Sequence, residues 1–336
     1  METWCVVVPR EQAEAVRRRL RDDGLLLKNL KIRSEGDFLL LPTSERADIG
    51  SPTRRTDFEE AFAPSRSYRD AVRVPEAVRP LLPRSFDVIG DIAVLKIPEE
   101  LGPYRSEIGA SILTWNPRIR VVAQDRGVAG AYRVRQIEII AGERRTTTAH
   151  VEHGLRYHVD VARAYFSPRL AAERLCIAEQ VRPGETVADP FAGVGPYAIL
   201  IARRRRPERV IASDANPDAV SLLHRNVREN RAGQVVVREG DARGILAEAA
   251  PLDRIILDLP HAAFDYLADA FESLSAAGVV HLYGMLGVSE RIERLAEIRA
   301  LAETLGRRIE EVRIREVRAY SPSRHHVAFD VTVGRG

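Results

Sequence analysis

Asp189-Pro190-Phe191-Ala192-Gly193-Val194-Gly195-Pro196 is the stretch that decides the fold, because it joins the end of a short strand-like run to a helix-like run. Gly193 and Gly195 allow a tight turn and let the backbone approach a ligand without interference from Cβ atoms. A strand, a glycine-containing turn and a helix in this order are typical of a nucleotide-binding α/β unit. The stretch therefore predicts a doubly wound, Rossmann-like sheet built around it.

The pattern after Ser167 supports this prediction, because strand-like and helix-like runs alternate as in a parallel sheet covered by helices on both faces. We expect strands at residues 186–189, 209–214, 234–238, 254–258, 279–283, 311–318 and 326–333. We expect helices at residues 168–179, 197–204, 217–230, 244–250, 262–276 and 289–305. The last two strands have no long helix between them, which indicates an antiparallel final strand.

The N-terminal half has a different organisation. Residues 1–43 read as a small α/β unit with a strand at 4–8, a helix at 11–22 and a hairpin at 31–41. Residues 44–69 lack a sustained period and are expected to be a linker. From residue 86 short strands are expected at 88–97, 118–123, 132–140, 146–150 and 156–161, with a helix at 99–113. The predicted domains are 1–60 (small α/β, with the linker), 70–160 (compact α+β) and 161–336 (Rossmann-like).

Composition narrows the class of protein. A chain of 336 residues is long enough for two or three domains, and no run approaches the ~20 apolar residues of a membrane span. The start of the chain lacks a secretory signal pattern, so a cytoplasmic protein without membrane partners is expected. It is also expected to be a monomer. Cys5 and Cys176 are the two cysteines, and their spacing predicts neither a disulfide framework nor a metal site. The net charge of +3 is too small for a uniformly basic nucleic-acid-binding surface.

Acidic residues after the next two strands indicate what the glycine turn binds. Asp214 ends the second strand, where a carboxylate can accept both hydroxyls of a ribose, and Asp241 follows the third strand, within reach of an adenine amine. No third glycine follows Gly195, so a cofactor without a pyrophosphate fits better than a dinucleotide. The competing interpretation of each acid is a helix N-cap or turn former.

Several motifs together resemble one family. The segments Tyr165-Phe166-Ser167-Pro168-Arg169-Leu170 and Glu173-Arg174, with the glycine turn, resemble the archaeal and eukaryotic tRNA (guanine-N1)-methyltransferases that act at position 37. Segments 132–136, 141–143, 150–160, 258–260, 280–281 and 320–322 also match in kind. The resemblance covers about residues 86–333, and the small N-terminal unit resembles the extra domain of the archaeal members.

The resemblance implies S-adenosylmethionine as the cofactor and tRNA as the partner. By resemblance Glu173 is the base that removes the N1 proton of guanine, Arg133 stabilises the charge that develops on O6, and Arg169 and Pro260 contact the substrate. Asp258, which departs from the family pattern, is the third residue expected in the catalytic group. The implied cofactor-binding residues are Tyr165, Asp189, Phe191, Ala192, Gly193, Val194, Gly195, Asp214, Ala215, Asp241 and Ala242.

One residue departs from the family pattern. The family favours Asn-Leu-Pro where this chain has Asp258-Leu259-Pro260. An ionised Asp accepts hydrogen bonds but cannot donate them, so it could accept from guanine N1–H and its amine, or share the task of the base. The departure leaves open a tricyclic wyosine precursor as a second substrate.

A tRNA enzyme must hold the RNA backbone while the target base is extruded. The implied contacts are to the anticodon stem-loop and, through the N-terminal unit, the tRNA elbow. Candidate basic clusters, each of which also reads as a solvated surface, are Arg17, Arg18, Arg19 and Arg21; Arg54, Arg55 and Arg66; residues 203–206; and Arg324, His325 and His326. Two other functions stay open at this point, namely the aminocarboxypropyl transferase of the wyosine pathway and a non-catalytic RNA-binding scaffold.

Overall fold

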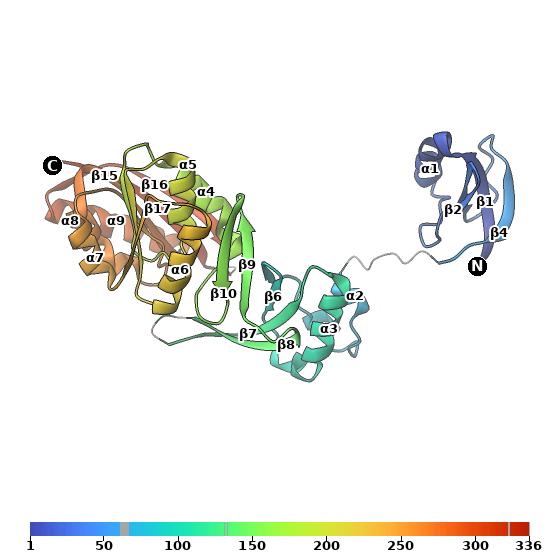
Figure 1. Cartoon of the computed structure of the whole chain (residues 1–336), viewed down its shortest axis with the longest axis horizontal. Helices are drawn as coiled ribbons and strands as arrows, with labels where there is room; N and C mark the ends of the chain where they lie inside the picture. The colour runs from blue at the N-terminus through green and yellow to red at the C-terminus, as the bar shows by residue number, and fades with distance from the viewer. Residues whose placement is uncertain (61–66, 131, 133, 322, 336) are drawn as a thin grey trace. The chain divides into compact units, whose positions relative to one another are not determined.

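The computed structural model describes residues 1–60, 67–130, 132, 134–321 and 323–335. The chain divides into two units, Met1–Ala71 and Val72–Gly336, which are described separately (Figure 1).

The smaller unit contains, within its described residues, an antiparallel sheet in the order β2-β3-β1-β4 with one long helix packed against it. Leu20 of this helix is fully buried with Val6, Val8 and Leu41 of the sheet. The predicted strand, helix and hairpin of residues 1–43 are therefore confirmed. The elements are β1 (Glu2–Pro9), η1 (Arg10–Gln12), α1 (Ala13–Asp22), β2 (Arg33–Glu35), β3 (Phe38–Thr43), β4 (Thr53–Asp57) and α2 (Tyr68–Ala71).

The prediction that residues 44–69 form a linker was wrong for its first part. Strand β4 pairs antiparallel with β1 over five residues and forms an edge of the sheet. Its sequence, Thr-Arg-Arg-Thr-Asp, has no apolar residue, because an edge strand can be held by backbone hydrogen bonds and charged pairs alone. Arg54 and Arg55, expected on the linker, instead pair with Glu35 and Glu2 on this sheet.

The larger unit begins with a four-stranded sheet, counted over its described residues, in the order β5-β6-β7-β8. The predicted single strand at 88–97 is two strands, because the chain turns at Gly90 and forms the β5–β6 hairpin. Strand β6 is parallel to β7, and α3 makes the crossover between them. The elements are η2 (Arg79–Leu81), β5 (Asp87–Ile89), β6 (Ile92–Leu95), η3 (Glu99–Tyr104), α3 (Arg105–Trp115), β7 (Val121–Ala129) and β8 (Val134–Gly142).

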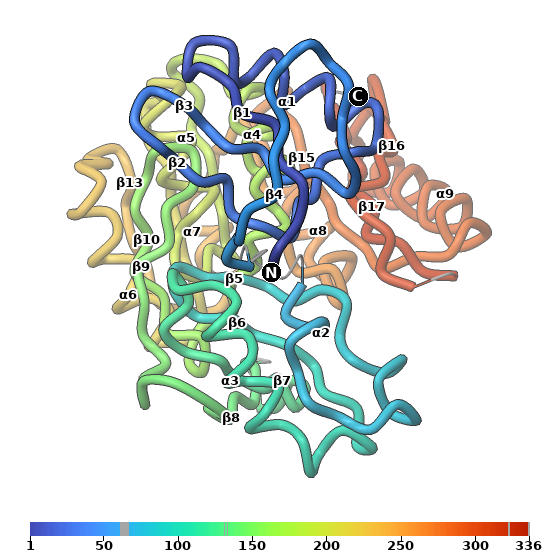
Figure 2. Tube along the Cα trace, turned by 90° about the vertical axis from the view of Figure 1, so that its right-hand side faces the viewer, coloured from blue at the N-terminus to red at the C-terminus, as the bar shows by residue number. Residues whose placement is uncertain are grey.

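A hairpin of β9 (Thr147–Glu152) and β10 (Leu155–Asp160) follows and lies beside helix α6 (Pro217–Glu229), as Figure 2 shows. Two asparagines at the end of this helix bond the backbone of β10 as a neighbouring strand would. The side chain of Asn226 accepts from His158 N at 2.7 Å and donates to His158 O at 3.1 Å. The side chain of Asn230 does the same for Arg156 at 2.9 and 2.7 Å.

The rest of the larger unit forms, over its described residues, a seven-stranded sheet in the order β13-β12-β11-β14-β15-β17-β16. Strands β11 to β15 pair in parallel, and β17 is antiparallel to both of its neighbours. This order confirms the predicted Rossmann-like sheet and its antiparallel final strand. The strands are β11 (Thr186–Asp189), β12 (Arg209–Asp214), β13 (Val235–Glu239), β14 (Leu252–Leu257), β15 (Leu274–Leu286), β16 (Arg307–Ala319) and β17 (His325–Arg335).

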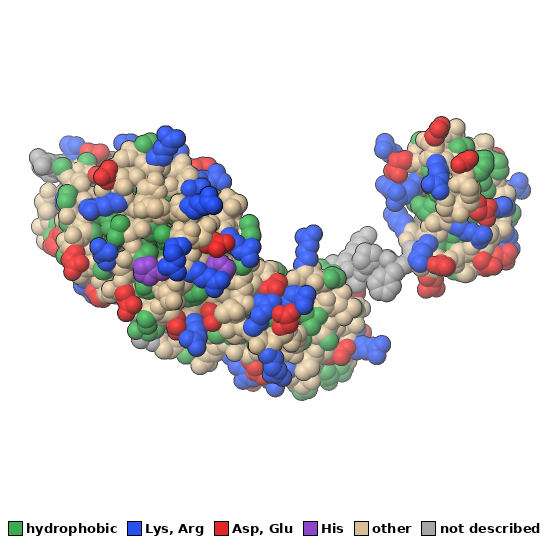
Figure 3. Space-filling model, in the orientation of Figure 1, with side chains coloured by type: hydrophobic (Ala, Val, Ile, Leu, Met, Phe, Trp, Pro, Cys, Tyr) green, Lys and Arg blue, Asp and Glu red, His purple; other side chains and the backbone are tan. Residues whose placement is uncertain are grey.

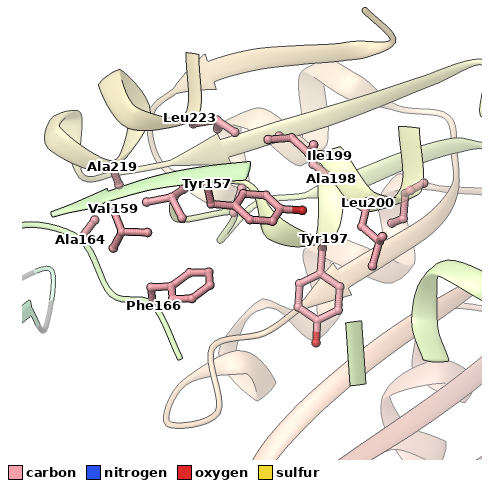
Figure 4. Close-up of a cluster of buried hydrophobic side chains, with 14 of the residues drawn as sticks. Tyr157, Val159, Ala164, Phe166, Tyr197, Ala198, Ile199, Leu200, Ala219 and Leu223 are labelled. Atoms are coloured by element: carbon pink, nitrogen blue, oxygen red, sulfur yellow. The ribbon is translucent and has the colours of Figure 1, made fainter. Parts of the chain in front are cut away.

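Helices cover both faces of this sheet. One face packs against α4, α5 and α6, and its core includes Tyr157, Phe166 and Tyr197 (Figure 4). The other face packs against α7, α8 and α9, which lie on the left of this unit in Figure 1. The helices are η4 (Pro168–Leu170), α4 (Ala171–Gln180), α5 (Pro196–Arg205), α6 (Pro217–Glu229), α7 (Ala242–Ala249), η5 (Ala263–Tyr266), α8 (Leu267–Ser273) and α9 (Val288–Thr304).

Candidate active site

The glycine turn between β11 and α5 is fastened to the end of β12. Gly193, at φ +54°, donates its backbone N–H to Asp214 Oδ2 at 2.8 Å, and Ala192 N donates to Ser213 O at 2.8 Å. Gly195 has φ +90°, and a Cβ at this position would lie 2.3 Å from Leu223 Cδ1 of α6. Glycine at 195 is therefore required both by the backbone conformation and by the close packing of the turn.

Asp189, at the end of β11, is a fully buried carboxylate whose two oxygens have no hydrogen-bond partner among the described residues. Burial, with the charges of Asp258 and Asp214 nearby, raises the pKa of Asp189 well above its ordinary value. Leaving a buried acceptor unpaired is costly, so such a group commonly belongs to a binding site. The unpaired oxygens of Asp189 could therefore accept hydrogen bonds from a bound ligand.

The two further acids differ in their surroundings. Asp214 Oδ1 accepts from Asn216 N at 2.9 Å, and burial raises the pKa of Asp214. Asp241 is exposed and caps α7 by accepting from Arg243 N at 3.0 Å. The N-cap interpretation of Asp241 is thus correct, and its carboxylate lies after β13 as expected.

Other predicted cofactor-binding residues follow these acids closely in the sequence. Ala215 is exposed after β12, whereas Ala242 is buried in the first turn of α7. Val194 is buried, and its carbonyl accepts from Asn226 Nδ2 at 2.9 Å. Phe191 packs edge-on against Tyr266 with ring centroids 5.0 Å apart. The three acid-bearing loops follow β11, β12 and β13, which are adjacent in the sheet, and this set fits a nucleoside cofactor that lacks phosphate.

Tyr165 and Arg169 lie where the sheet domain meets the preceding α+β part of the same unit. The Tyr165 side chain is 47% exposed, its carbonyl oxygen is 3.5 Å from a Cβ built at Gly193, and the Arg135 guanidinium lies over its ring at 5.5 Å. Asp87 of β5 accepts from Arg169 Nε at 2.6 Å and from Arg135 Nη2 at 3.0 Å. Arg169 is therefore held by Asp87 beside Tyr165.

Glu173, the predicted base, is in the first turn of α4 and is 6% exposed. Arg315 of β16 donates to both of its oxygens, from Nη1 to Oε2 at 2.8 Å and from Nη2 to Oε1 at 2.9 Å. Tyr283 of β15 donates its hydroxyl to Oε1 at 2.7 Å. Sequence reasoning missed both partners, because they follow Glu173 by 142 and 110 residues and no local motif marks them.

Arg133, the predicted partner of Glu173, lies outside the described residues. Asp258 is near Glu173, and its pKa is raised to about 6, mainly by burial and further by the Glu173 charge. His326 Nε2 is 3.9 Å from Asp258 Oδ1. This imidazole is 2% exposed, both ring nitrogens are unpaired among the described residues, and burial lowers its pKa to about 4. Pro260 is half-buried, and its carbonyl accepts from Met285 N at 3.2 Å.

Several of the arginines proposed for RNA binding make contacts within the protein. Arg205 Nε donates to Val181 O at 2.8 Å, and Arg324 pairs with Glu290 and donates to Met285 O at 3.0 Å. Arg66 and Pro322 lie outside the described residues. Figure 3 shows basic side chains interspersed with acidic ones on the visible face, as the small net charge predicted.

Among the described residues, no group of three or more His, Cys, Asp or Glu side chains is arranged to hold a metal ion. In the same part of the chain, none of the helices is both long and apolar enough to cross a membrane.

Comparison with known proteins matches all three parts of the chain. The TRM5/TYW2 methyltransferase domain matches residues 148–313, the TYW2 N-terminal domain residues 69–146, and the tRNA methyltransferase 5 N-terminal domain residues 5–49. The tRNA (guanine(37)-N(1))-methyltransferase Trm5b of Pyrococcus abyssi is 40% identical over 98% of this chain and 99% of its own, and its crystal structure has a TM-score of 0.84.

Two further similarities are informative. A structure titled as the complex of aTrm5 and tRNALeu has 30% identity and a TM-score of 0.81, covering 98% of this chain and 99% of its own. The tRNA 4-demethylwyosine(37)-methyltransferase Taw21 of Saccharolobus solfataricus is 31% identical over 74% of this chain and 93% of its own.

Proposed function

The chain belongs to the TRM5/TYW2 methyltransferase family, and from this premise we propose that it methylates N1 of guanosine 37 in tRNA. The methyl donor is S-adenosylmethionine. The observation that carries the proposal is the buried carboxylate of Glu173, on the face of the sheet that also packs against α5 after the glycine turn. The whole chain aligns end to end with guanine-37 N1-methyltransferases. The same end-to-end similarity disfavours the aminocarboxypropyl transferase and the non-catalytic scaffold.

The residues of the glycine turn and the following acids would hold the cofactor. Asp189, Asp214 and Asp241 offer carboxylate oxygens to its ribose, base or amine, and the open backbone at Gly193 allows it to approach closely. When bound, the cofactor supplies an electrophilic methyl group on a sulfonium. Its alignment with the target nitrogen provides part of the rate enhancement.

The chain's own residues would handle the proton and the charge. N1 of guanine carries a proton and is a poor nucleophile until that proton is removed, and Glu173 would accept it. The negative charge that then develops on O6 would be stabilised by the Arg133 guanidinium. Arg169, held by Asp87 beside Tyr165, would place the extruded base. A general base alone supplies about 10²–10⁴-fold.

A second substrate, the tricyclic wyosine precursor, is supported by two observations. The relative from Saccharolobus solfataricus bears the name of a 4-demethylwyosine methyltransferase. Asp258 offers a partly buried carboxylate with a pKa of about 6 beside Glu173, so it can be present as acid or anion near neutral pH and can meet either pattern of base-edge groups.

The partner would be tRNA, whose anticodon stem-loop would bind the larger unit and whose elbow would bind the smaller unit. The smaller unit matches the tRNA methyltransferase 5 N-terminal domain, and its helix α1 carries four arginines.

Incubation of unmodified tRNA with methyl-labelled S-adenosylmethionine, followed by nucleoside analysis, tests the function. We expect 1-methylguanosine, and a tRNA carrying the wyosine precursor should give a methylated tricyclic nucleoside if the second activity exists. An aminocarboxypropyl product, or binding of tRNA without any transfer, would replace the proposal with one of its alternatives.

A further inference from the structure

A row of polar side chains crosses four adjacent strands beneath Glu173. Arg315 on β16, Asp330 on β17, His281 on β15 and Arg254 on β14 lie on neighbouring strands, and His281 is in register with Asp330. The row continues to Glu185, just before β11. These side chains occupy the face that packs against α4, which also carries a large apolar cluster.

Each link in the row is a direct contact. Arg315 donates from Nε to Asp330 Oδ2 at 2.8 Å and from Nη2 to Asp330 Oδ1 at 3.1 Å. Asp330 Oδ1 is 2.7 Å from His281 Nδ1, and His281 Nε2 is 2.7 Å from Arg254 Nη1. Arg254 donates to Glu185 at 2.8 and 3.1 Å.

The donors in the row fix the state of the histidine. Arginine can only donate, so His281 Nε2 must accept from Arg254 and the ring proton is on Nδ1, which donates to Asp330. Burial lowers the pKa of His281, which agrees with a neutral ring. Hydrogen bonds from His281 and Arg315 hold the pKa of the buried Asp330 well below its usual range, so this carboxylate remains charged and anchors Arg315.

Arg315 thus lies between two carboxylates, each less than a tenth exposed. A buried carboxylate without a partner would be strongly unfavourable, and a bidentate guanidinium fixes both the position and the plane of its partner. Arg315 therefore determines the direction of the Glu173 carboxylate.

We propose that Arg315, anchored by Asp330, is a positioning residue for methyl transfer, which orients the Glu173 carboxylate toward the target base. This inference rests on the proposed function, in which Glu173 accepts the N1 proton. When Glu173 takes up that proton and loses its charge, Arg315 keeps the Asp330 carboxylate as a partner, so this partly buried cation is not left unpaired.

A double-mutant cycle tests the inference. The variants are Arg315→Met, Glu173→Ala and the double variant, with single-turnover methylation of unmodified tRNA measured at saturating cofactor and cofactor affinity measured separately. We expect Arg315→Met to slow transfer about 10–100-fold and to change cofactor affinity less than about twofold. In the Glu173→Ala background the same change should slow transfer less than about threefold, because the effect passes through Glu173.

Matched controls separate positioning from folding. Arg313→Ala removes an exposed arginine two residues away that pairs with Glu311, and should leave the rate unchanged. Arg315→Lys keeps the charge but cannot make the bidentate contact, so its rate should fall between those of Arg315→Met and the parent chain. If Arg315→Met fails to fold, as shown by circular dichroism, Arg315→Lys is carried through the same cycle.

The outcomes distinguish the two proposals. Fully additive losses in the cycle, or a lysine variant as fast as the parent chain, would overturn the role of Arg315 while leaving Glu173 as the base. A Glu173→Ala variant that transfers methyl at nearly the parent rate would overturn the proposed function itself.

Discussion

Replacing Asn226 with Ala should detach strand β10 and loosen the glycine turn together. The Asn226 side chain is fully buried and bonds three backbone groups, namely His158 N, His158 O and Val194 O. Each of these three buried groups, if left unpaired, costs about 1–3 kcal/mol. Because the freed hairpin becomes partly hydrated, we expect the free energy of unfolding to fall by about 3–5 kcal/mol in total. Because Val194 belongs to the glycine turn, cofactor affinity should fall as well.

Asn230→Ala is the matched control, because Asn230 is only half-buried and makes the same pair of bonds, one helical turn away, to the exposed Arg156. Water can replace those bonds, so a loss of only about 1 kcal/mol is expected. Urea unfolding is followed by fluorescence in a Trp4→Phe background, in which Trp115 reports on the larger unit. Equal losses for the two asparagines would refute the argument that burial determines the difference.

Three further changes have defined outcomes. The Asp258→Asn variant should become more stable relative to the parent chain as pH rises from about 4 to about 6, by about 1–3 kcal/mol, and should keep that gain above about pH 6. The reason is that burial raises the pKa of Asp258 to about 6, so that its ionisation opposes folding of the parent chain. Denaturation of both proteins across this pH range measures the difference in their free energies of unfolding. Gly195→Ala should lower cofactor affinity at least about tenfold through its clash with Leu223, whereas Gly184→Ala, at φ +83° in open space, should leave titrated affinity unchanged. Deleting residues 1–60 should weaken tRNA binding in filter assays at several salt concentrations and leave cofactor affinity intact, and unchanged tRNA affinity would contradict the proposed role of the smaller unit.

The Rossmann-like sheet could be read from the sequence because its strands carry a local signal. Strands β11 and β12 are short apolar runs that end in Asp189 and Asp214, and both were predicted to the residue. Strand β4 was missed because its charged sequence carries no hydrophobic period. The β5–β6 hairpin was predicted as a single strand because only Gly90 and Asp91 separate its two apolar runs.

The candidate site was only partly predictable for a related reason. Asp189, Asp214 and Asp241 follow successive parallel strands, and the carboxyl ends of such strands meet at one edge of the sheet. The topology alone therefore predicts that these acids lie near one another. Arg315 stands in the charged run Arg-Ile-Arg-Glu-Val-Arg, which looks like a solvated strand. Its contact with Glu173 depends on tertiary pairing and on two register shifts in β16. Sequence spacing contains no information about such a contact.

The place of β17 in the sheet has a consequence for biosynthesis. This strand lies between β15 and β16, although it follows both along the chain. A nascent polypeptide leaving the ribosome therefore presents β16 before the strand that will join it to the sheet exists. Asp330 arrives on that last strand, so a chain interrupted before it carries every other polar group of the row and still cannot anchor Arg315. Translation must pass Asp330 before Arg315 can be held between its two carboxylates.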